Sequence, residues 1–225
     1  MDKNPQEVAA MFDGVARRYD IVNDILSLGR TKAWRRAATK VIAPAPGMKI
    51  LDLAAGTGSS SAPLAAAGAD VIAADFSEGM IAAGKKARPD LTFMKADALN
   101  LPFPDDSFDL LTISFGLRNT QNTAKALAEA RRVVKPGGRL VVVEFSSPTF
   151  APFRAIYMNY LMRALPAIAK VTSSNPDAYI YLADSIRAWP DQKGLAAAIV
   201  DAGWSQVGWK NLTGGVVAIH MAVAP

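Results

Sequence analysis

Residues 50–58 read Ile50-Leu51-Asp52-Leu53-Ala54-Ala55-Gly56-Thr57-Gly58. The apolar start of this stretch predicts a short buried strand, and the small residues after it predict a tight turn that opens a helix. Small residues let the backbone of such a turn come close to a ligand. In open α/β sheets, ligands bind beyond the carboxyl ends of the strands, where this turn would lie. The stretch therefore predicts the first unit of an α/β sheet with a ligand-binding turn.

The glycine pattern of this turn separates three interpretations. A dinucleotide-binding turn requires G-x-G-x-x-G, but Ser61 stands where the third glycine would be. A phosphate-binding P-loop would end in Gly-Lys-Ser or Gly-Lys-Thr, which the turn lacks. The third interpretation is a structural turn without a ligand.

Strand and helix patterns alternate on both sides of this turn. Apolar runs predict strands over 49–54, 71–75, 91–95, 108–115, 139–145, 205–211 and 216–223, and helical patterns fall at 59–67, 77–87, 123–134 and 191–202. This alternation predicts an α/β fold with a mostly parallel sheet covered on both faces. The short Thr213-Gly214-Gly215 connection predicts an antiparallel closing pair. We expect a single domain over 1–225, with an N-terminal helical arm (1–46) and a helical insertion (147–190).

Composition excludes several chemistries. The chain has no cysteine and one histidine, His220. Disulfides, cysteine-based zinc sites, thiol nucleophiles and histidine-rich metal sites are therefore excluded, and we predict no metal. No signal peptide is visible, and no apolar run reaches the roughly 20 residues that a bilayer requires. We expect a cytoplasmic protein.

Basic residues gather in two stretches that contain no acid. The first holds Arg30, Lys32, Arg35, Arg36, Lys40 and Lys49, and the second, over 150–175, holds Arg154, Arg163 and Lys170. Nucleic acid is disfavoured as a partner because the aromatic residues of a strand-binding surface are not interleaved. An anionic membrane surface, at the inner face of the cell membrane, and a plain solvated face remain as alternatives.

Two further acidic turns follow the second and third strands. Asp75 ends the second strand, where a carboxylate can accept both hydroxyls of a ribose. The alternative role of Asp75 is to cap the next helix, although Ser77 is better placed for that. Asp97-Ala98 follows the third strand, where a carboxylate and a backbone amide could bind the edge of an adenine. Its alternative is an ordinary turn.

Taken together, these turns resemble the Rossmann-like class I methyltransferases that use S-adenosylmethionine. Lys135-Pro136-Gly137-Gly138 before the fifth strand fits the same pattern. A narrower resemblance, to the C-methyltransferases of menaquinone and ubiquinone biosynthesis and most of all to the demethylmenaquinone branch, covers nearly the whole chain. It rests on Met11 to Asp20 (MFDGVARRYD), Ile113 to Asn119 (ISFGLRN), Val143 to Ser146 (VEFS) and Asn211 to His220 (NLTGGVVAIH).

This resemblance implies a fold, a reaction and a set of site residues. The fold would be a seven-stranded sheet with an antiparallel closing strand, and the reaction the methylation of a ring carbon of a lipophilic polyprenyl quinol, most of all demethylmenaquinol. The residues similar to the family's cofactor contacts are Thr57, Asp75, Asp97, Ala98 and Ser114. The first turn adds Asp52, Ala54, Gly56 and Gly58. Tyr19 is similar to an N-terminal aromatic that closes the cofactor site, with packing of the arm as its alternative.

The base that would assist methylation is left open. Arg118 and Asn119 lie in the loop that the family places at the acceptor, where an arginine is too basic to accept a proton and would stabilise a phenolate or orient a water. His220 is the second candidate, and a satisfied core histidine is its alternative. Other functions left open are methylation of a ubiquinone-pathway benzoquinol, O- or N-methylation of a small molecule, nicotinamide-dependent oxidation and cofactor binding without catalysis. The oligomeric state is also open, with a homodimer as one arrangement.

Overall fold

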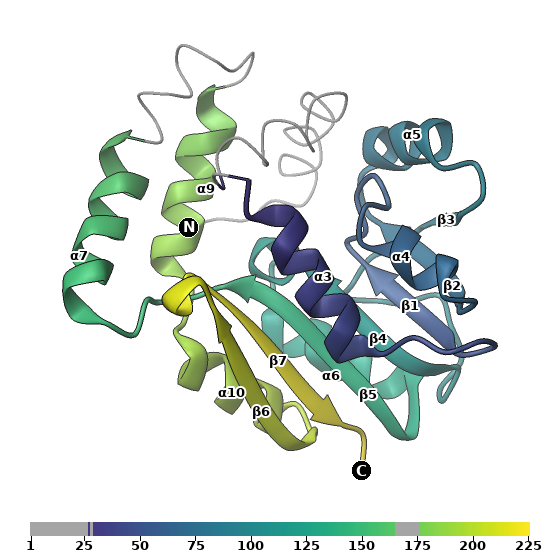
Figure 1. Cartoon of the computed structure of the whole chain (residues 1–225). Coiled ribbons are helices and arrows are strands. Elements are labelled where there is room, and N and C mark those ends of the chain that lie inside the picture. The colour runs from purple at the N-terminus through teal and green to yellow at the C-terminus, as the bar shows by residue number, and fades with distance from the viewer. Residues whose placement is uncertain (1–26, 28, 165–175) are drawn as a thin grey trace.

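A computed structural model describes residues 27, 29–164 and 176–225, and its centre is one seven-stranded sheet (Figure 1). The strands are β1 (Lys49–Leu53), β2 (Asp70–Asp75), β3 (Thr92–Lys95), β4 (Phe108–Ser114), β5 (Val134–Phe145), β6 (Ser205–Leu212) and β7 (Val217–Val223). Their order is β3-β2-β1-β4-β5-β7-β6. β1 to β5 pair in parallel, and β7 is antiparallel to both β5 and β6. The expected fold class and antiparallel closing pair are confirmed.

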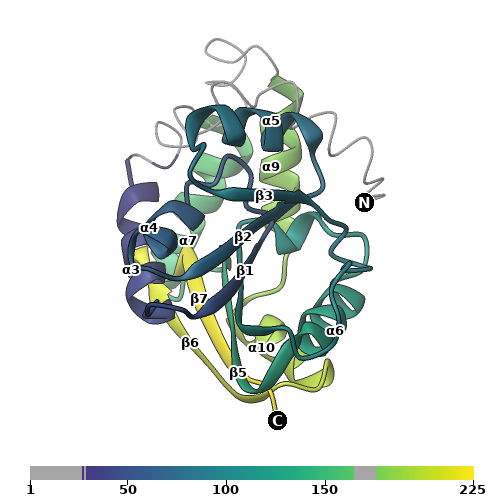
Figure 2. The same cartoon turned by 90° about the vertical axis from the view of Figure 1, so that its right-hand side faces the viewer.

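Helices cover both faces of the sheet. α3 (Thr31–Ile42), α4 (Ser61–Ala66) and α5 (Glu78–Ala87) pack on one face, and α6 (Thr123–Val133) and α10 (Gln192–Asp201) pack on the other (Figure 2). The strands are apolar nearly throughout because both faces are buried. Ser77 caps α5 by accepting a hydrogen bond from the Met80 amide, as its position predicted.

The predicted insertion contains two helices in its described part. α7 (Ala151–Asn159) continues into the π-helical turn η2 (Tyr160–Ala164), and α9 (Pro176–Ala188) follows. Figure 1 shows α7 and α9 together beyond the edge of the sheet where β4 and β5 end. The division into arm, sheet and insertion stays a prediction, because much of the arm and residues 165–175 lie outside the described residues. No helix in the described ranges is long and apolar enough to cross a membrane.

The fifth strand begins earlier than its apolar pattern predicted. We expected Pro136-Gly137-Gly138 to be a turn before a strand at Arg139, but β5 starts at Val134. The pairing register shifts there, with Phe108 opposite Val134 and Leu110 opposite Arg139, so the glycines form a bulge inside the strand. A Cβ on Gly138 would lie 2.6 Å from Val134 Cγ1 and 3.0 Å from the Asp109 carbonyl oxygen, so only glycine fits.

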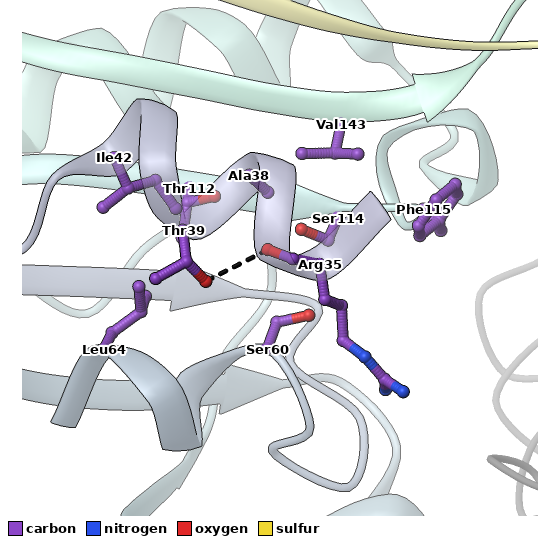
Figure 3. A pocket seen from close by; sticks show the side chains of 10 residues that line it. All are labelled: Arg35, Ala38, Thr39, Ile42, Ser60, Leu64, Thr112, Ser114, Phe115 and Val143. Atoms are coloured by element: carbon purple, nitrogen blue, oxygen red, sulfur yellow. Dashed lines mark hydrogen bonds between the residues drawn. The ribbon is translucent and has the colours of Figure 1, made fainter. Parts of the chain in front are cut away.

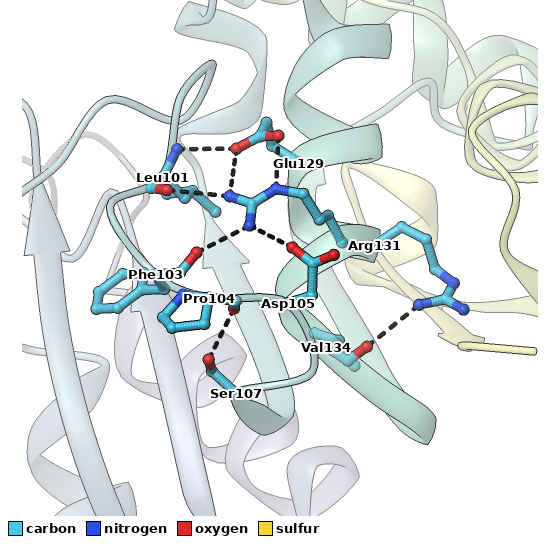
Figure 4. Close-up of polar contacts among 9 residues, drawn as sticks. Leu101, Phe103, Pro104, Asp105, Ser107, Glu129, Arg131 and Val134 are labelled. Carbon is cyan, nitrogen blue, oxygen red and sulfur yellow. Dashed lines mark hydrogen bonds and ion pairs between the residues drawn. The ribbon is translucent and has the colours of Figure 1, made fainter.

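An ion-pair cluster fixes the connection between β3 and β4. The Arg132 guanidinium of α6 donates to Glu129 and Asp105 at 2.8 Å and to the carbonyl oxygens of Leu101 and Phe103 at 3.0 and 2.8 Å. Figure 4 shows Leu101, Phe103, Asp105 and Glu129 gathered at this point. The bond from Arg132 holds the pKa of the Glu129 carboxyl below its usual value. The cluster anchors the end of the loop that begins at Asp97.

Candidate functional site

The strand order places a ligand site between β1 and β4. β2 lies on one side of β1 and β5 lies beyond β4, so the connections leave the sheet in opposite directions at this point. In doubly wound sheets such a switch point is where ligands bind, beyond the carboxyl ends of the strands. The turn after β1 and the loop after β4 meet there, because a Cβ on Gly116 would lie 2.2 Å from Ala54 Cβ.

The turn after β1 depends on left-handed backbone conformations. Ala54, Gly56 and Gly58 have φ angles of 56°, 57° and 77°. A Cβ on Gly58 would come within 2.8 Å of the Phe93 ring, so the turn packs against β3 only with glycine at this position. Nothing lies within 4 Å of a Cβ built on Gly56, which is therefore open on its outer side. The result is a narrow turn whose backbone is accessible to a ligand.

Asp75 joins the turn after β2 to the turn after β1. Its carboxylate accepts the Gly56 amide hydrogen at 2.7 Å through Oδ2 and the Ser77 amide hydrogen at 2.9 Å through Oδ1. These bonds hold the carboxylate against the glycine turn, where nucleotide-binding sheets bind a ribose. The predicted alternative, that Asp75 caps α5, is wrong because Ser77 is the N-cap.

The third acidic turn lies along the same rim. β3 pairs in parallel with β2, and Asp97 follows it. Asp97 Oδ1 accepts the Leu99 amide hydrogen at 2.9 Å, which fixes a turn with an exposed carboxylate and a half-buried Ala98. The turns carrying Gly56, Asp75 and Asp97 thus follow three neighbouring strands, in the order that the sequence predicted.

Asp52 lies inside the sheet beneath the first turn. It is fully buried and accepts a hydrogen bond from Ser61 Oγ at 2.6 Å through Oδ2, while Oδ1 has no partner among the described residues. Burial raises the pKa of the Asp52 carboxyl to about 7, the bond from Ser61 opposes this shift, and the negative charge of Asp75 adds to it. Ser61, the residue that replaces the third glycine of a dinucleotide turn, therefore ties the start of α4 to β1.

Replacing Asp52 with Asn is expected to remove part of the pH dependence of stability. The folded chain keeps the Asp52 proton up to about pH 7, whereas an unfolded chain loses it near about pH 3.9. Between these values the folded state binds more protons, so its stability falls as the pH rises. Between about pH 5 and 8, the free energy of unfolding should fall by about 2–3 kcal/mol more in the parent than in Asp52→Asn. Urea unfolding at both pH values measures this; equal slopes would contradict it.

A crevice beside the first turn separates α3 from the sheet. Its volume of about 10 Å³ is close to what one water molecule needs. Ser60 and Ser114 both face it, together with Phe115 (Figure 3). Ser114 ends β4 next to the switch point, and its contact with a cofactor stays a prediction. Arg35 of α3 lines the same crevice and extends past Ser60, so part of the basic stretch 30–49 lies at this rim.

Arg118 and Asn119 follow β4 in the short helix η1 (Leu117–Asn119). Arg118 is 3% exposed and forms an ion pair with Glu144 of β5 at 2.8 Å. The Asn119 side chain accepts a hydrogen bond from the Tyr181 hydroxyl of α9 at 3.3 Å. Both residues thus lie between the sheet and the insertion, close in sequence to Ser114, and their catalytic roles stay predictions.

His220 lies apart from the turns described above. It sits in the middle of β7 opposite Val142 and is 1% exposed. Its Nε2 lies 2.9 Å from the Gln192 carbonyl oxygen, and its ring packs against Trp209. Val142 belongs to the cluster under α6 and α10, whereas Ser114 faces α3, so His220 lies on the other face of the sheet. Burial lowers the pKa of His220. These contacts are those of a core histidine, and a catalytic role has no support from them.

The side chains that contact Arg118 and Asn119 were not predicted from the sequence. Glu144, Tyr181 and Ser185 all contact Arg118 or Asn119, although they lie 26 to 67 positions away along the chain. Glu144 is an acid inside the apolar run of β5 and belongs to the Val143 to Ser146 block of the family resemblance, but neither signal predicted its ion pair with Arg118. Tyr19 lies outside the described residues. Within the described ranges, no group of three or more His, Cys, Asp or Glu residues could hold a metal ion.

Comparisons with known proteins agree with this geometry. Residues 1–224 match the model of the ubiE/COQ5 methyltransferase family. A demethylmenaquinone methyltransferase of Renibacterium salmoninarum is 61% identical over 222 residues, which cover 99% of this chain and 94% of that protein. A protein of the same name from Streptomyces avermitilis is 61% identical over 220 residues, or 98% and 95% of the two chains.

Solved structures with low sequence identity share the fold. A SAM-dependent methyltransferase from Thermotoga maritima superimposes with a TM-score of 0.69 at 19% identity, over 96% of this chain and 99% of that one. A SAM-dependent methyltransferase from Aquifex aeolicus gives a TM-score of 0.61 at 18% identity, over 85% and 89% of the two chains.

Proposed function

Because the chain belongs to the ubiE/COQ5 methyltransferase family, we propose that it methylates a ring carbon of demethylmenaquinol with S-adenosylmethionine as the methyl donor. Relatives that are 61% identical over nearly the full length of both chains are named demethylmenaquinone methyltransferases. The observation that carries the proposal is the bond between Asp75 and the Gly56 amide, which joins two ligand-binding turns at the switch point.

The residues at the switch point fit S-adenosylmethionine. Its hydroxyls and amino group require acceptors, and the turns offer the carboxylates of Asp75 and Asp97. The unpartnered Oδ1 of Asp52 lies buried beneath the turn that would receive the amino-acid end. The left-handed glycine turn offers backbone groups rather than side chains. When bound, S-adenosylmethionine supplies a methyl group already activated by its positive sulfur.

The protein must then hold donor and acceptor in line and exclude water. Orienting two reactants can supply several kcal/mol of the barrier. A quinol ring carbon is a weak nucleophile until the neighbouring hydroxyl loses its proton, so stabilising the phenolate would raise the rate. Arg118 carries a permanent positive charge at the junction of β4 and the insertion, and Asn119 provides an amide beside Tyr181. We assign phenolate stabilisation to this pair.

A turnover assay tests the proposed function. The purified chain is incubated with methyl-labelled S-adenosylmethionine and either demethylmenaquinol or a demethylated benzoquinol of equal tail length. We expect label in the naphthoquinol product, with at least about tenfold lower kcat/KM for the benzoquinol. Label in the benzoquinol alone would assign the chain to the ubiquinone branch. Label in neither would refute quinol methylation.

We also propose that the insertion binds an anionic membrane surface at the inner face of the cell membrane, where a polyprenyl quinol resides. α7 contributes no buried residue. Phe150 and Ile156 are 66% and 68% exposed, and Arg154 and Arg163 are also exposed. Apolar side chains with basic neighbours are typical of helices that lie in a membrane interface. Figure 1 shows α7 at the outer edge of the molecule. Lys170 lies outside the described residues.

The membrane proposal predicts binding to anionic vesicles at low salt. Replacing both Phe150 and Ile156 with Ser should weaken vesicle binding at least about tenfold, since burying each side chain is worth about 1.5–3 kcal/mol. Val200→Ser is the matched control, because Val200 is 53% exposed on α10, outside the insertion. Sedimentation with vesicles across a salt series measures both. An equal loss in the control, or no binding by the parent chain, would refute this surface.

A further inference from the structure

Glu144 is a buried charge that the proposed function does not use. It lies near the end of β5 and is 1% exposed. Its Oε1 accepts from Arg118 Nη1 at 2.8 Å and from the Phe145 amide at 2.8 Å, and its Oε2 accepts from the Arg118 amide at 3.3 Å. Among the described residues, the hydrogen bonds of this carboxylate therefore go to Arg118 and to the next residue, Phe145.

The Arg118 guanidinium lies where three elements meet. Besides Glu144 of β5, it donates to the Phe115 carbonyl oxygen at 2.5 Å and, through Nε, to Ser185 Oγ of α9 at 3.3 Å. Its Cζ lies 5.1 Å from the centre of the Phe145 ring. The positive charge of Arg118 also opposes the burial that raises the pKa of Tyr181. The arginine is thus surrounded by β5, by the loop after β4 and by the insertion.

α9 is bound to this junction at two points. Ser185 meets Arg118, and Tyr181 donates to Asn119. Tyr181 and Ser185 are four residues apart, so they share one face of the helix. One face of the insertion helix is therefore tied to two adjacent residues of the loop that follows Ser114.

The buried ion pair between Arg118 and Glu144 costs desolvation free energy. Removing two charges from water costs several kcal/mol each, and a buried pair adds little net stability compared with apolar residues of similar size. A planar guanidinium can instead be oriented by a carboxylate that accepts from it. The pair therefore fixes the orientation of Arg118 rather than adding to stability.

We propose that Glu144 is a positioning residue, which holds Arg118 in the orientation that both docks α9 and presents positive charge to the acceptor. The inference rests on the proposed function for its effect on turnover. Glu144 contacts Arg118 and the Phe145 amide of its own strand, so any effect of Glu144 on the acceptor is transmitted through Arg118. Its loss should slow methyl transfer without changing the affinity for S-adenosylmethionine, which is assigned to the carboxylates of Asp52, Asp75 and Asp97 on β1 and at the ends of β2 and β3.

A double-mutant cycle tests this coupling. Glu144→Gln keeps the shape of the side chain and removes its charge, and we expect kcat to fall about 100-fold, with the Kd for S-adenosylmethionine within about twofold of the parent. In an Arg118→Ala background, the same change should have no further effect on kcat. If the double variant instead shows the product of the two single-variant losses in kcat, the proposal is overturned. Asp109→Asn is the matched control, since it removes the carboxylate of a different ion pair, with Lys135 at the opposite end of the sheet. This variant should keep the kcat of the parent.

A second measurement needs no substrate and separates this inference from the proposed function. Ser185→Ala leaves the ion pair intact and removes the bond from Arg118 to α9. Hydrogen exchange over residues 176–188 should become faster in Ser185→Ala and in Glu144→Gln, with exchange in β1 unchanged. Unchanged exchange over α9 in Ser185→Ala would overturn the docking role, even if Glu144→Gln fails to fold. If the parent chain methylates no quinol, the exchange result still stands by itself.

Discussion

Replacing Arg118 with Ala is expected to lower kcat about 100- to 1,000-fold while the Kd for S-adenosylmethionine stays within about twofold. The guanidinium is a buried positive charge in the loop that follows Ser114, and without it a phenolate that forms during methyl transfer would lose its stabilisation. The carboxylates assigned to the donor are those of Asp52 in β1, Asp75 at the end of β2 and Asp97 after β3, so donor binding does not depend on this side chain. Single-turnover kinetics with labelled S-adenosylmethionine, beside a calorimetric titration, measure the two quantities.

Two controls make the Arg118 result decisive. Breaking a buried ion pair costs about 3–5 kcal/mol because the partner charge remains buried, so thermal unfolding must show that the variant is folded at the assay temperature. Arg118→Lys keeps the charge but loses the planar fork, and an intermediate kcat is expected. Unchanged turnover in the Ala variant would remove Arg118 from the mechanism.

Asp75→Ala is expected to weaken binding of S-adenosylmethionine about 100-fold. The change removes a carboxylate that accepts the Gly56 and Ser77 amide hydrogens and that would accept the ribose hydroxyls. Hydrogen bonds to a charged group are worth about 1.5–3 kcal/mol each, and about 2.8 kcal/mol corresponds to a hundredfold change in Kd. Isothermal titration of the donor into each protein measures the ratio.

A matched control separates the position of this carboxylate from its charge. Asp90 is exposed in the connection between α5 and β3, which enters β3 at its amino end, so Asp90→Ala removes one negative charge without touching the turns. Its Kd should equal that of the parent. An Asp75→Ala variant that binds as tightly as Asp90→Ala would contradict the role assigned to Asp75.

Much of the fold could be predicted because its signals are local. Apolar runs marked all seven strands to within about two residues, except at the start of β5, and the short Thr213-Gly214-Gly215 connection marked the antiparallel pair. The start of β5 was missed because a bulge is defined by the partner strand: the shift between Phe108 and Leu110 is a property of pairing with β4. The pattern of Pro136-Gly137-Gly138 alone is typical of a turn.

The site could be predicted in part for the same reason. Gly56 and Asp97 follow strands and Asp75 ends one, so the topology of parallel strands brings their turns to one rim. The partners of Arg118 could not be predicted, because Glu144 and Ser185 are brought to it by sheet order and helix packing. His220 was considered as a catalytic residue because it is the one histidine of the chain. The structure instead places it in the core under α10.

The central claim, that three turns at one rim bind S-adenosylmethionine, is tested most directly by calorimetric titration of the purified chain with S-adenosylmethionine and, separately, with NAD. We predict saturable binding of one S-adenosylmethionine per chain and no heat of binding with NAD. Absence of binding to S-adenosylmethionine, or tighter binding of NAD, would contradict the claim.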